Sequence, residues 1–355
     1  MTPAEASLHR RPAGPRLLSV SSPVPREVWQ AAADNDPEAL AWQTPAFMDA
    51  LCATGPFEDA GRLYATRDGR ALVLPMVRRR GLSGRLAVEA SLPLGWGVGG
   101  IIAAGGVRPD EVAAVFADLA DRSVLRRSVL PNPRLGAVWQ AARPSGVVAF
   151  PRLAHVLELE GGFARVWAER FRSGTRSGVR KAERAGLSVQ CDTSGDLFPA
   201  FATLYQVSAA RWAQQEGASS WSARGGNPVP RFRGLAERLG RTCRIWMAWL
   251  DGRPAAAILV LQGAHASSYA LGAMDKDLAG PTRANDLLQR LAIEDACRAG
   301  CRYYHMGESG ASVSTAQFKE RFGARPFAYA EYRMGRFPVT GLRRTLAPLL
   351  RRLAG

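Results

Sequence analysis

Lysine is rare in this chain, and one lysine lies in a short motif whose residue types suit acyl transfer. Of the 47 basic residues, 44 are arginines and only Lys181, Lys276 and Lys319 are lysines. An ammonium group is a compact donor that a planar guanidinium does not replace. Retention of lysine at position 319 therefore predicts a specific role, such as hydrogen bonding to the oxyanion that forms when an amine attacks an ester. A chance codon choice is the alternative.

Covalent catalysis and metal chemistry have no support in the sequence. It contains no G-x-S-x-G motif and no C-x-x-C pair, and its four histidines lack metal-ligand spacing. We therefore predict no metal site and no cofactor. The odd number of cysteines, five, favours reduced thiols and a cytoplasmic protein. Acyl transfer needs no protein nucleophile, because an amine held beside an activated ester attacks it directly.

The region 253–329, which contains this lysine, has the pattern of an α/β unit. Residues 255–274 carry no charged side chain, but Gly263-Ala264 divides them into two halves, each too short to cross a bilayer. We therefore predict a buried β-hairpin. The next stretch has apolar residues at helical spacing and ends at Gly300, and a third strand follows it.

A cluster of basic residues lies on a predicted helix over 163–185. Arg172, Arg176 and Arg180 recur at four-residue spacing and share one face, with Lys181 beside them. Guanidinium groups bind phosphate through paired hydrogen bonds, so this face predicts a phosphate clamp, with a solvated basic surface as the alternative. The net charge of +16 favours a polyanionic partner, whether RNA, an anionic lipid surface or a phosphorylated substrate.

Several motifs occur together in a combination typical of one family. They are the hairpin and helix, a strand that ends in G-E-S, the sequence FKERFGARP, the basic stretch RSGTRSGVRKAERAGLSV, and, in the first half, WQTPAFMDAL, LYATRDGRALVLPMVRR and PLGWGVGGII. The chain resembles the FemAB-like (FemXAB) aminoacyltransferases over roughly residues 40–337. The resemblance implies an α/β (α+β) fold of two tandem GNAT-like (N-acyltransferase-like) domains, each with a mixed central sheet flanked by helices.

The predicted domain boundaries follow from these segments. They are a mobile N-terminal tail over 1–26, a first GNAT-like domain over 27–160, a second, catalytic GNAT-like domain over 161–338 that begins with the basic helix, and a basic amphipathic helix over 339–355. This last helix either docks on the core or makes weak peripheral contact with a membrane through 340–353. We expect the protein to be a monomer.

The resemblance also implies roles for individual residues. The pair Phe318-Lys319 matches a family pair that stabilises the tetrahedral intermediate through the phenylalanine backbone N–H and the lysine side chain. Tyr269 matches a tyrosine near the reacting carbonyl, whereas Leu271 stands where a second tyrosine is common, so a two-tyrosine proton relay is not expected. The predicted substrate-binding residues are Arg176, Arg180, Lys181, Arg211, Trp212, Trp96, Glu308, Ser309 and Arg325.

The acyl donor has more than one candidate. GNAT domains that use acyl-CoA usually carry R/Q-x-x-G-x-G/A at a helix N-terminus, where backbone N–H groups hold the pyrophosphate. Neither half has this motif, and Gly280-Pro281 stands at the corresponding place in the second half. We therefore predict transfer of an aminoacyl group from aminoacyl-tRNA to an amine, either a cell-wall precursor or a small metabolite. The alternatives are an acyl-CoA-dependent N-acyltransferase and a non-catalytic RNA- or membrane-surface-binding protein on the same fold.

Overall fold

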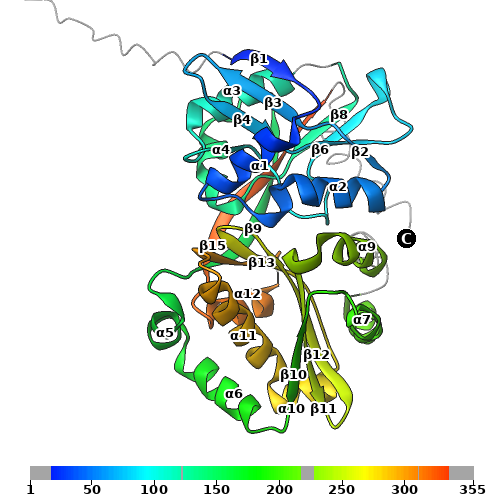
Figure 1. Ribbon diagram of the computed structural model, residues 1–355, viewed down its shortest axis with the longest axis vertical. Helices are drawn as coiled ribbons and strands as arrows, with labels where there is room; N and C mark the ends of the chain where they lie inside the picture. Colours follow the sequence, from blue (N-terminus) through cyan, green and yellow to red (C-terminus); the bar gives the residue numbers. More distant parts are fainter. Residues whose placement is uncertain (1–16, 121–122, 217–227, 311, 336–355) are drawn as a thin grey trace, which may run out of the picture.

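The computed structural model describes residues 17–120, 123–216, 228–310 and 312–335. One mixed, 11-stranded sheet runs through both halves (Figure 1), in the order β10-β11-β12-β13-β14-β9-β15-β8-β6-β5-β2. Helices flank it, so the predicted α/β class is confirmed. The strands are β2 (Phe57–Asp59), β5 (Val77–Arg79), β6 (Val88–Ser91), β8 (Arg126–Val129), β9 (Val148–Glu158), β10 (Ser188–Asp192), β11 (Cys243–Leu250), β12 (Arg253–Gln262), β13 (Ala266–Met274), β14 (Tyr303–Glu308) and β15 (Arg325–Gly335).

A second, four-stranded sheet lies in the first half, in the order β1-β3-β4-β7. Strands β3 and β4 form a hairpin with its turn at Asp68-Gly69, where Gly69 has the positive φ of 79° that such turns favour. The strands of this sheet are β1 (Leu17–Ser21), β3 (Arg62–Thr66), β4 (Ala71–Leu74) and β7 (Ile102–Ala103).

Residues 17–26, predicted as part of a mobile tail, instead form β1 and the start of α1 (Arg26–Asn35). Strand β1 pairs antiparallel with β3, with Val20 opposite Tyr64. A short strand at a sheet edge takes its backbone hydrogen bonds from its neighbour, so its own sequence needs no strong periodicity. Residues 1–16 lie outside the described part of the chain.

The helices of the first half follow local sequence signals. Helix α2 (Pro45–Thr54) begins after Thr44, whose hydroxyl accepts from the backbone N–H of Phe47. Helix α3 (Pro109–Leu119) has a proline and two acidic residues at its start and buries one apolar face. The short helix α4 (Gly136–Ala141) packs against β15.

The basic segment predicted as one helix over 163–185 is broken. It forms α5 (Gly162–Arg165), a π-helical turn over Val166–Arg170, and α6 (Ser173–Glu183). The break occurs at Phe171, whose extended backbone follows the turn. Its ring is buried against Phe322 of the region after Lys319, with ring centres 5.2 Å apart. Burial of this aromatic side chain redirects the chain.

The other helices of the second half surround its part of the sheet (Figure 1). The hairpin predicted over 253–274 and the helix that follows it are confirmed as β12, β13 and α11. The helices are α7 (Phe198–Glu216), α9 (Val229–Leu239), α10 (Lys276–Thr282), α11 (Ala284–Arg298) and α12 (Val313–Glu320).

Two long strands join the halves. Strand β9 pairs with β14 of the second half, and β15 pairs with both β9 and β8 of the first half. The last strand of the range 161–338 therefore lies partly in the first half's sheet. One hydrophobic core also contains residues from both halves, among them Trp29, Phe47, Phe201 and Tyr329.

Neither a membrane-spanning helix nor a metal-binding cluster is found within the described residues. No described helix is long and apolar enough to cross a bilayer. No group of His, Cys, Asp and Glu in this part of the chain is arranged to hold a metal ion. The predicted C-terminal helix over 339–355, with its proposed membrane contact through 340–353, lies outside the described residues.

Candidate functional site

The candidate site lies at a fork between two parallel strands. Strands β13 and β14 pair only over their first residues, with Ala266 opposite Tyr303 and Ser268 opposite His305. Beyond these residues the two strands pair no further, although β13 continues to Met274. The opening between them exposes backbone groups and side chains to a space that a ligand can enter.

A cavity of about 460 Å³ lies at this fork, between the two halves of the chain. Its walls are mostly apolar, with a few polar groups, which is the usual character of a small-molecule site. The first half contributes Trp42, Leu94, Gly95, Gly97, Val98 and Leu130, the second half contributes Arg231, Phe232, Tyr269, Ala270, Leu271, His305, Gly307, Glu308 and Gly310, and the joining strands contribute Arg152 and Tyr329.

Lys319 lies directly behind this cavity wall. It belongs to α12, which Ser312 caps by accepting from the N–H of Thr315. Its side chain is 3% exposed, and Nζ donates hydrogen bonds to the carbonyl groups of Gly307, at 2.8 Å, and Glu308, at 2.6 Å. Burial lowers the pKa of Lys319 to about 7, against the opposing effect of the Glu308 carboxylate.

The backbone that Lys319 holds is irregular. The pairing of β14 with β9 shifts register between His305 and Glu308, which takes the residues between them out of the regular ladder. Gly307 has a φ of 76°, and a Cβ added there would lie 3.5 Å from the carbonyl oxygen of Tyr269 and 3.9 Å from Lys319 Nζ. The lysine and the tyrosine backbone therefore face each other across the fork.

Glu308 is oriented by two side chains of the joining strands. Tyr329 donates from its hydroxyl to Oε1, and Arg152 pairs with Oε2 at 3.2 Å. Arg152 also pairs with the buried Glu331, at 3.0 Å. Burial raises the pKa of the Tyr329 hydroxyl far above its ordinary value, so Tyr329 remains a hydrogen-bond donor. The carboxylate is held in place at the cavity and still reaches solvent.

Two neutral donors line the same cavity. Burial raises the pKa of Tyr269 to about 12, so its hydroxyl remains protonated at neutral pH. Burial, together with nearby Lys319, lowers the pKa of His305 to about 4, so its ring is neutral. His305 Nδ1 accepts from the Gly307 N–H at 3.1 Å, which assigns the ring proton to Nε2. This nitrogen is buried, with no partner among the described residues.

Three of the other predicted residues lie close to the cavity without forming its wall. The Phe318 ring packs against Phe322 and under the Arg321 guanidinium. Ser309 is buried and forms a hydrogen bond with His155 at 2.8 Å. Trp96 packs edge-on against Phe57. Its neighbours in the sequence, Gly95 and Gly97, both line the cavity.

Arg211 and Trp212 lie on α7, outside the cavity wall. The Arg211 guanidinium donates to the carbonyl of Met274 at 3.3 Å, and Trp212 packs edge-on against Tyr205. Arg211 therefore fastens α7 to the end of β13, whereas the contact between Trp212 and Tyr205 lies within α7. Both were predicted to bind substrate, because their positions on a helix do not indicate which segment of the chain lies beside them.

The structure separates the basic residues of α6 from the fork. Arg176 donates to the carbonyl groups of Trp167, Ala168 and Phe171, so it closes the end of the π-helical turn. Arg180 and Lys181 are exposed on α6, which packs against α11 in the lower part of Figure 1. A phosphate clamp on this helix would be a surface site apart from the cavity.

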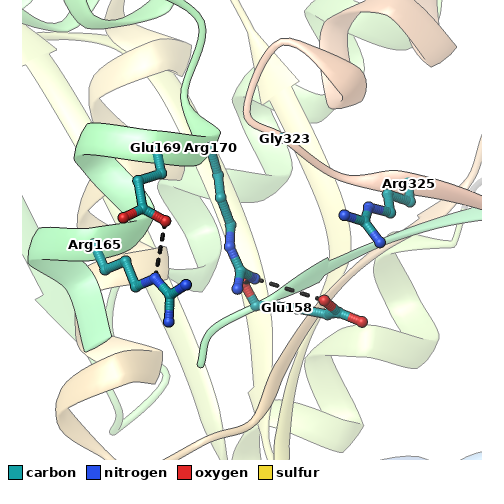
Figure 2. A pocket seen from close by; sticks show the side chains of 6 residues that line it. All are labelled: Glu158, Arg165, Glu169, Arg170, Gly323 and Arg325. Carbon is teal, nitrogen blue, oxygen red and sulfur yellow. Dashed lines mark hydrogen bonds and ion pairs between the residues drawn. The ribbon is translucent and has the colours of Figure 1, made fainter. Parts of the chain in front are cut away.

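Arg325 lines a different cavity, of about 410 Å³, that Figure 2 presents. Arg165 pairs there with Glu169 at 2.8 Å, and Arg170 lies beside Glu158. The three arginines around this space come from α5, from the π-helical turn and from the start of β15. Arg325 is thus not brought together with Glu308.

Four polar residues of the cavity wall were not predicted from the sequence, namely Arg152, Arg231, His305 and Tyr329. Tyr329 follows the FGARP motif closely, and His305 precedes Gly307 in the predicted strand, so both had a local signal. Arg152 and Arg231 had none, because their importance depends on residues that are distant along the chain.

Comparisons with known proteins agree with this architecture. Residues 169–320 match the model of a family described as an acetyltransferase (GNAT) domain. A search of curated proteins finds no match. The solved structure of FemX is similar, with a TM-score of 0.69 and 12% identity, over 92% of this chain and 99% of the FemX chain.

A second similar structure is the C-terminal domain of a protein from Agrobacterium fabrum described as a lysylphosphatidylglycerol synthetase. Its TM-score is 0.50 at 14% identity, over 92% of this chain and 96% of that domain. At such identities the likeness establishes the fold. The predicted FemXAB-like, tandem GNAT fold is confirmed.

Proposed function

We propose that this chain, which has the tandem GNAT fold also seen in FemX, forms an amide bond by transferring an aminoacyl group from aminoacyl-tRNA to an amine. The observation that carries the proposal is the position of Lys319, buried at the fork directly behind Glu308. The wall of one cavity includes the oriented carboxylate of Glu308 together with Tyr269 and His305, and the amino group of Lys319 lies directly behind it. This set meets the needs of direct acyl transfer without a covalent intermediate.

In the proposed reaction, the amine nitrogen attacks the ester carbonyl carbon, and the C=O electron pair moves onto oxygen. Glu308 accepts the proton that the amine loses. The remaining N–H of Lys319 and the hydroxyl of Tyr269 stabilise the oxyanion. The C–O bond to the tRNA ribose then breaks, and the departing oxygen takes the proton that Glu308 accepted from the amine. Amide and free tRNA are the products.

Phe318 has a smaller part in this scheme than the resemblance implied. Its backbone N–H lies beyond the first turn of α12, where amide groups are used within the helix. Oxyanion stabilisation therefore rests on the side chains of Lys319 and Tyr269. The Phe318 ring contributes packing that fixes α12.

The start of α11 supports a donor other than acyl-CoA. The carboxylate of Asp286 is buried in the first turn of this helix, where it pairs with Arg321. A Cβ added at Gly178 of α6 would lie 2.7 Å from Asp286 Oδ2, so α6 covers this helix end closely. An anionic side chain and a packed helix thus occupy the place where a pyrophosphate would need free N–H groups.

The charge of the chain and one neighbour's name agree with an aminoacyl-tRNA donor. A net charge of +16 attracts RNA without regard to sequence. The name lysylphosphatidylglycerol synthetase includes an aminoacyl group. Arg180 and Lys181, exposed on α6, are candidates for contact with the tRNA backbone.

The proposal is tested by following donor deacylation. The purified protein is incubated with mixed aminoacyl-tRNAs or, separately, with acyl-CoAs, each with a mixture of amines. We expect aminoacyl-tRNA to be consumed only when both protein and amine are present. Glu308→Gln should strongly reduce this consumption. The control Glu237→Gln, which changes an exposed carboxylate on α9, should not reduce it. Consumption of acyl-CoA alone would support the acyl-CoA alternative. Binding of tRNA without consumption of either donor would support a non-catalytic protein.

A further inference from the structure

Arg231 is a half-buried cation in the cavity wall, and no carboxylate in the described part of the chain pairs with it. It lies on α9, with its guanidinium 5.4 Å from the ring centre of Trp96 and 5.7 Å from that of Phe232. No described residue forms an ion pair or hydrogen bond with it, and its Nε is buried without an acceptor. Arg152, on the same cavity, instead pairs with two carboxylates.

The surroundings of Arg231 leave space for its guanidinium and, among the described residues, supply aromatic rings but no carboxylate. A Cβ added at Gly95 would lie 3.0 Å from Nη2, and Gly95 has a φ of 81°, so a larger residue there would crowd the group. Burial lowers the pKa of Arg231. Burying a charge without a partner is costly, so a ligand that brings an anion would complete this site.

Besides Arg152, which is already paired with two carboxylates, the cavity presents two opposite charges. Arg231 offers a guanidinium from α9, and Glu308 offers an oriented carboxylate from β14. The rest of the wall is largely apolar and includes Trp42, Leu130 and Leu271. A ligand that matches both charges must carry an anion and a cation within the span of one small cavity.

We propose that the acceptor is a small zwitterion, an apolar amino acid or short peptide, with its carboxylate on Arg231 and its amino group at Glu308. This inference rests on the proposed function and names its acceptor class. Nη1 and Nη2 suit the two oxygens of a carboxylate, since Nε is buried. A cavity of about 460 Å³ holds a molecule of this size, with its apolar side chain against the apolar walls.

The test is equilibrium binding by calorimetry, without any acyl donor. The probes are leucine, methionine, phenylalanine and tryptophan, each as the free amino acid, the carboxamide and the N-acetyl derivative, at concentrations up to about 10 mM. We expect at least one free amino acid to bind. Its carboxamide and its N-acetyl derivative should each bind about tenfold or more weakly, because each lacks one of the two charges.

Arg231→Gln should remove the preference for the free acid over the carboxamide and change carboxamide affinity by less than about twofold. A purely structural role would weaken both ligands equally. The matched control is Arg233→Gln, which changes an exposed arginine on the same helix, paired with Glu237 at 3.2 Å. Arg231→Lys, which keeps the charge, should retain part of the preference and covers the case in which Arg231→Gln fails to fold.

Three results would overturn the inference: no free amino acid binds, acid and carboxamide bind equally to the wild type, or the Arg231 variants keep the full preference. These results are separable from failure of the proposed function, because the binding assay contains no donor. If aminoacyl-tRNA is consumed as fast with phenylalaninamide as with phenylalanine, aminoacyl transfer stands and the zwitterionic acceptor does not.

Discussion

Lys319 uses two of its three N–H groups to hold the irregular backbone of Gly307 and Glu308. It therefore has two roles in the proposed reaction, which are to position Glu308 and to donate to the oxyanion. A guanidinium is longer and planar, so it satisfies neither geometry. The proposed reaction thus gives a reason for lysine at position 319 in a chain that uses arginine almost everywhere.

We expect Lys319→Arg and Lys319→Ala each to lower the turnover of acyl transfer by about 10²–10³, the usual cost of losing one oxyanion donor. The matched control is Lys276→Arg, at an exposed lysine on α10. Turnover is measured at saturating donor after circular dichroism has established folding. A fall of less than about threefold in Lys319→Arg would mean that the active site lies elsewhere.

The buried ammonium also predicts a pH dependence of stability. The pKa of Lys319 is lowered from 10.5 to about 7 in the folded chain, so between these values the unfolded state binds more protons. The contribution of Lys319 to the free energy of unfolding therefore rises with pH across this window.

Comparison with Lys319→Met isolates this contribution, since all other groups titrate in both proteins. The melting temperature of the wild type minus that of the variant should increase from pH 7 upwards. A difference that stays constant or decreases would show that the lysine is not desolvated in the folded state.

At the scale of elements, the contact of α4 with β15 determines where Tyr329 stands. Gly136 begins α4, and a Cβ added there would lie 2.4 Å from the carbonyl oxygen of Ala328 and 2.8 Å from the Cβ of Tyr329. The backbone of β15 lies directly against Gly136, and α4 is packed in place, so neither element can shift to accommodate a Cβ. Tyr329 in turn orients Glu308.

Gly136→Ala should therefore destabilise the protein by about 1–3 kcal/mol, the usual cost of overpacking, and should also lower acyl transfer. Urea unfolding measures the first effect. Gly146→Ala is the control, because a Cβ at that position meets no atom within 4 Å. Equal effects of the two substitutions would show that α4 is not packed closely against β15.

At the scale of the whole molecule, the two halves share one sheet and hydrophobic cores that contain residues of both. Strand β14 has β9 as a neighbour, and β15 runs between β9 and β8. Removal of the first half would leave β14 and β15 with unpaired edges and would expose the shared core.

We therefore expect the full chain to unfold in one transition, with equal calorimetric and van't Hoff enthalpies. A fragment over 161–335 should not give a cooperative melt. Scanning calorimetry of both proteins makes the comparison. Two resolved transitions in the full chain, or a cooperative melt of the fragment, would show that the halves are independent domains.

The sequence by itself determined the elements whose signals are local. The hairpin over 253–274, the helix that follows it, and the helices that became α2 and α3 depend on apolar periodicity, turn residues and capping residues, all of which act over a few positions. The scarcity of lysine singled out Lys319 in the same local way. The FKERFGARP motif and its companions were enough to predict the tandem GNAT fold.

Only the tertiary structure decided which side chains share the cavity. Arg152 and Glu308 are 156 positions apart along the chain, and Arg231 reaches the same space from a helix of the second half. The end of the basic helix at Phe171 depends on burial against Phe322. Such contacts form between distant segments, so no local pattern encodes them. Side-chain type alone also does not distinguish an arginine that forms an ion pair, such as Arg152, from one without a carboxylate partner among the described residues, such as Arg231.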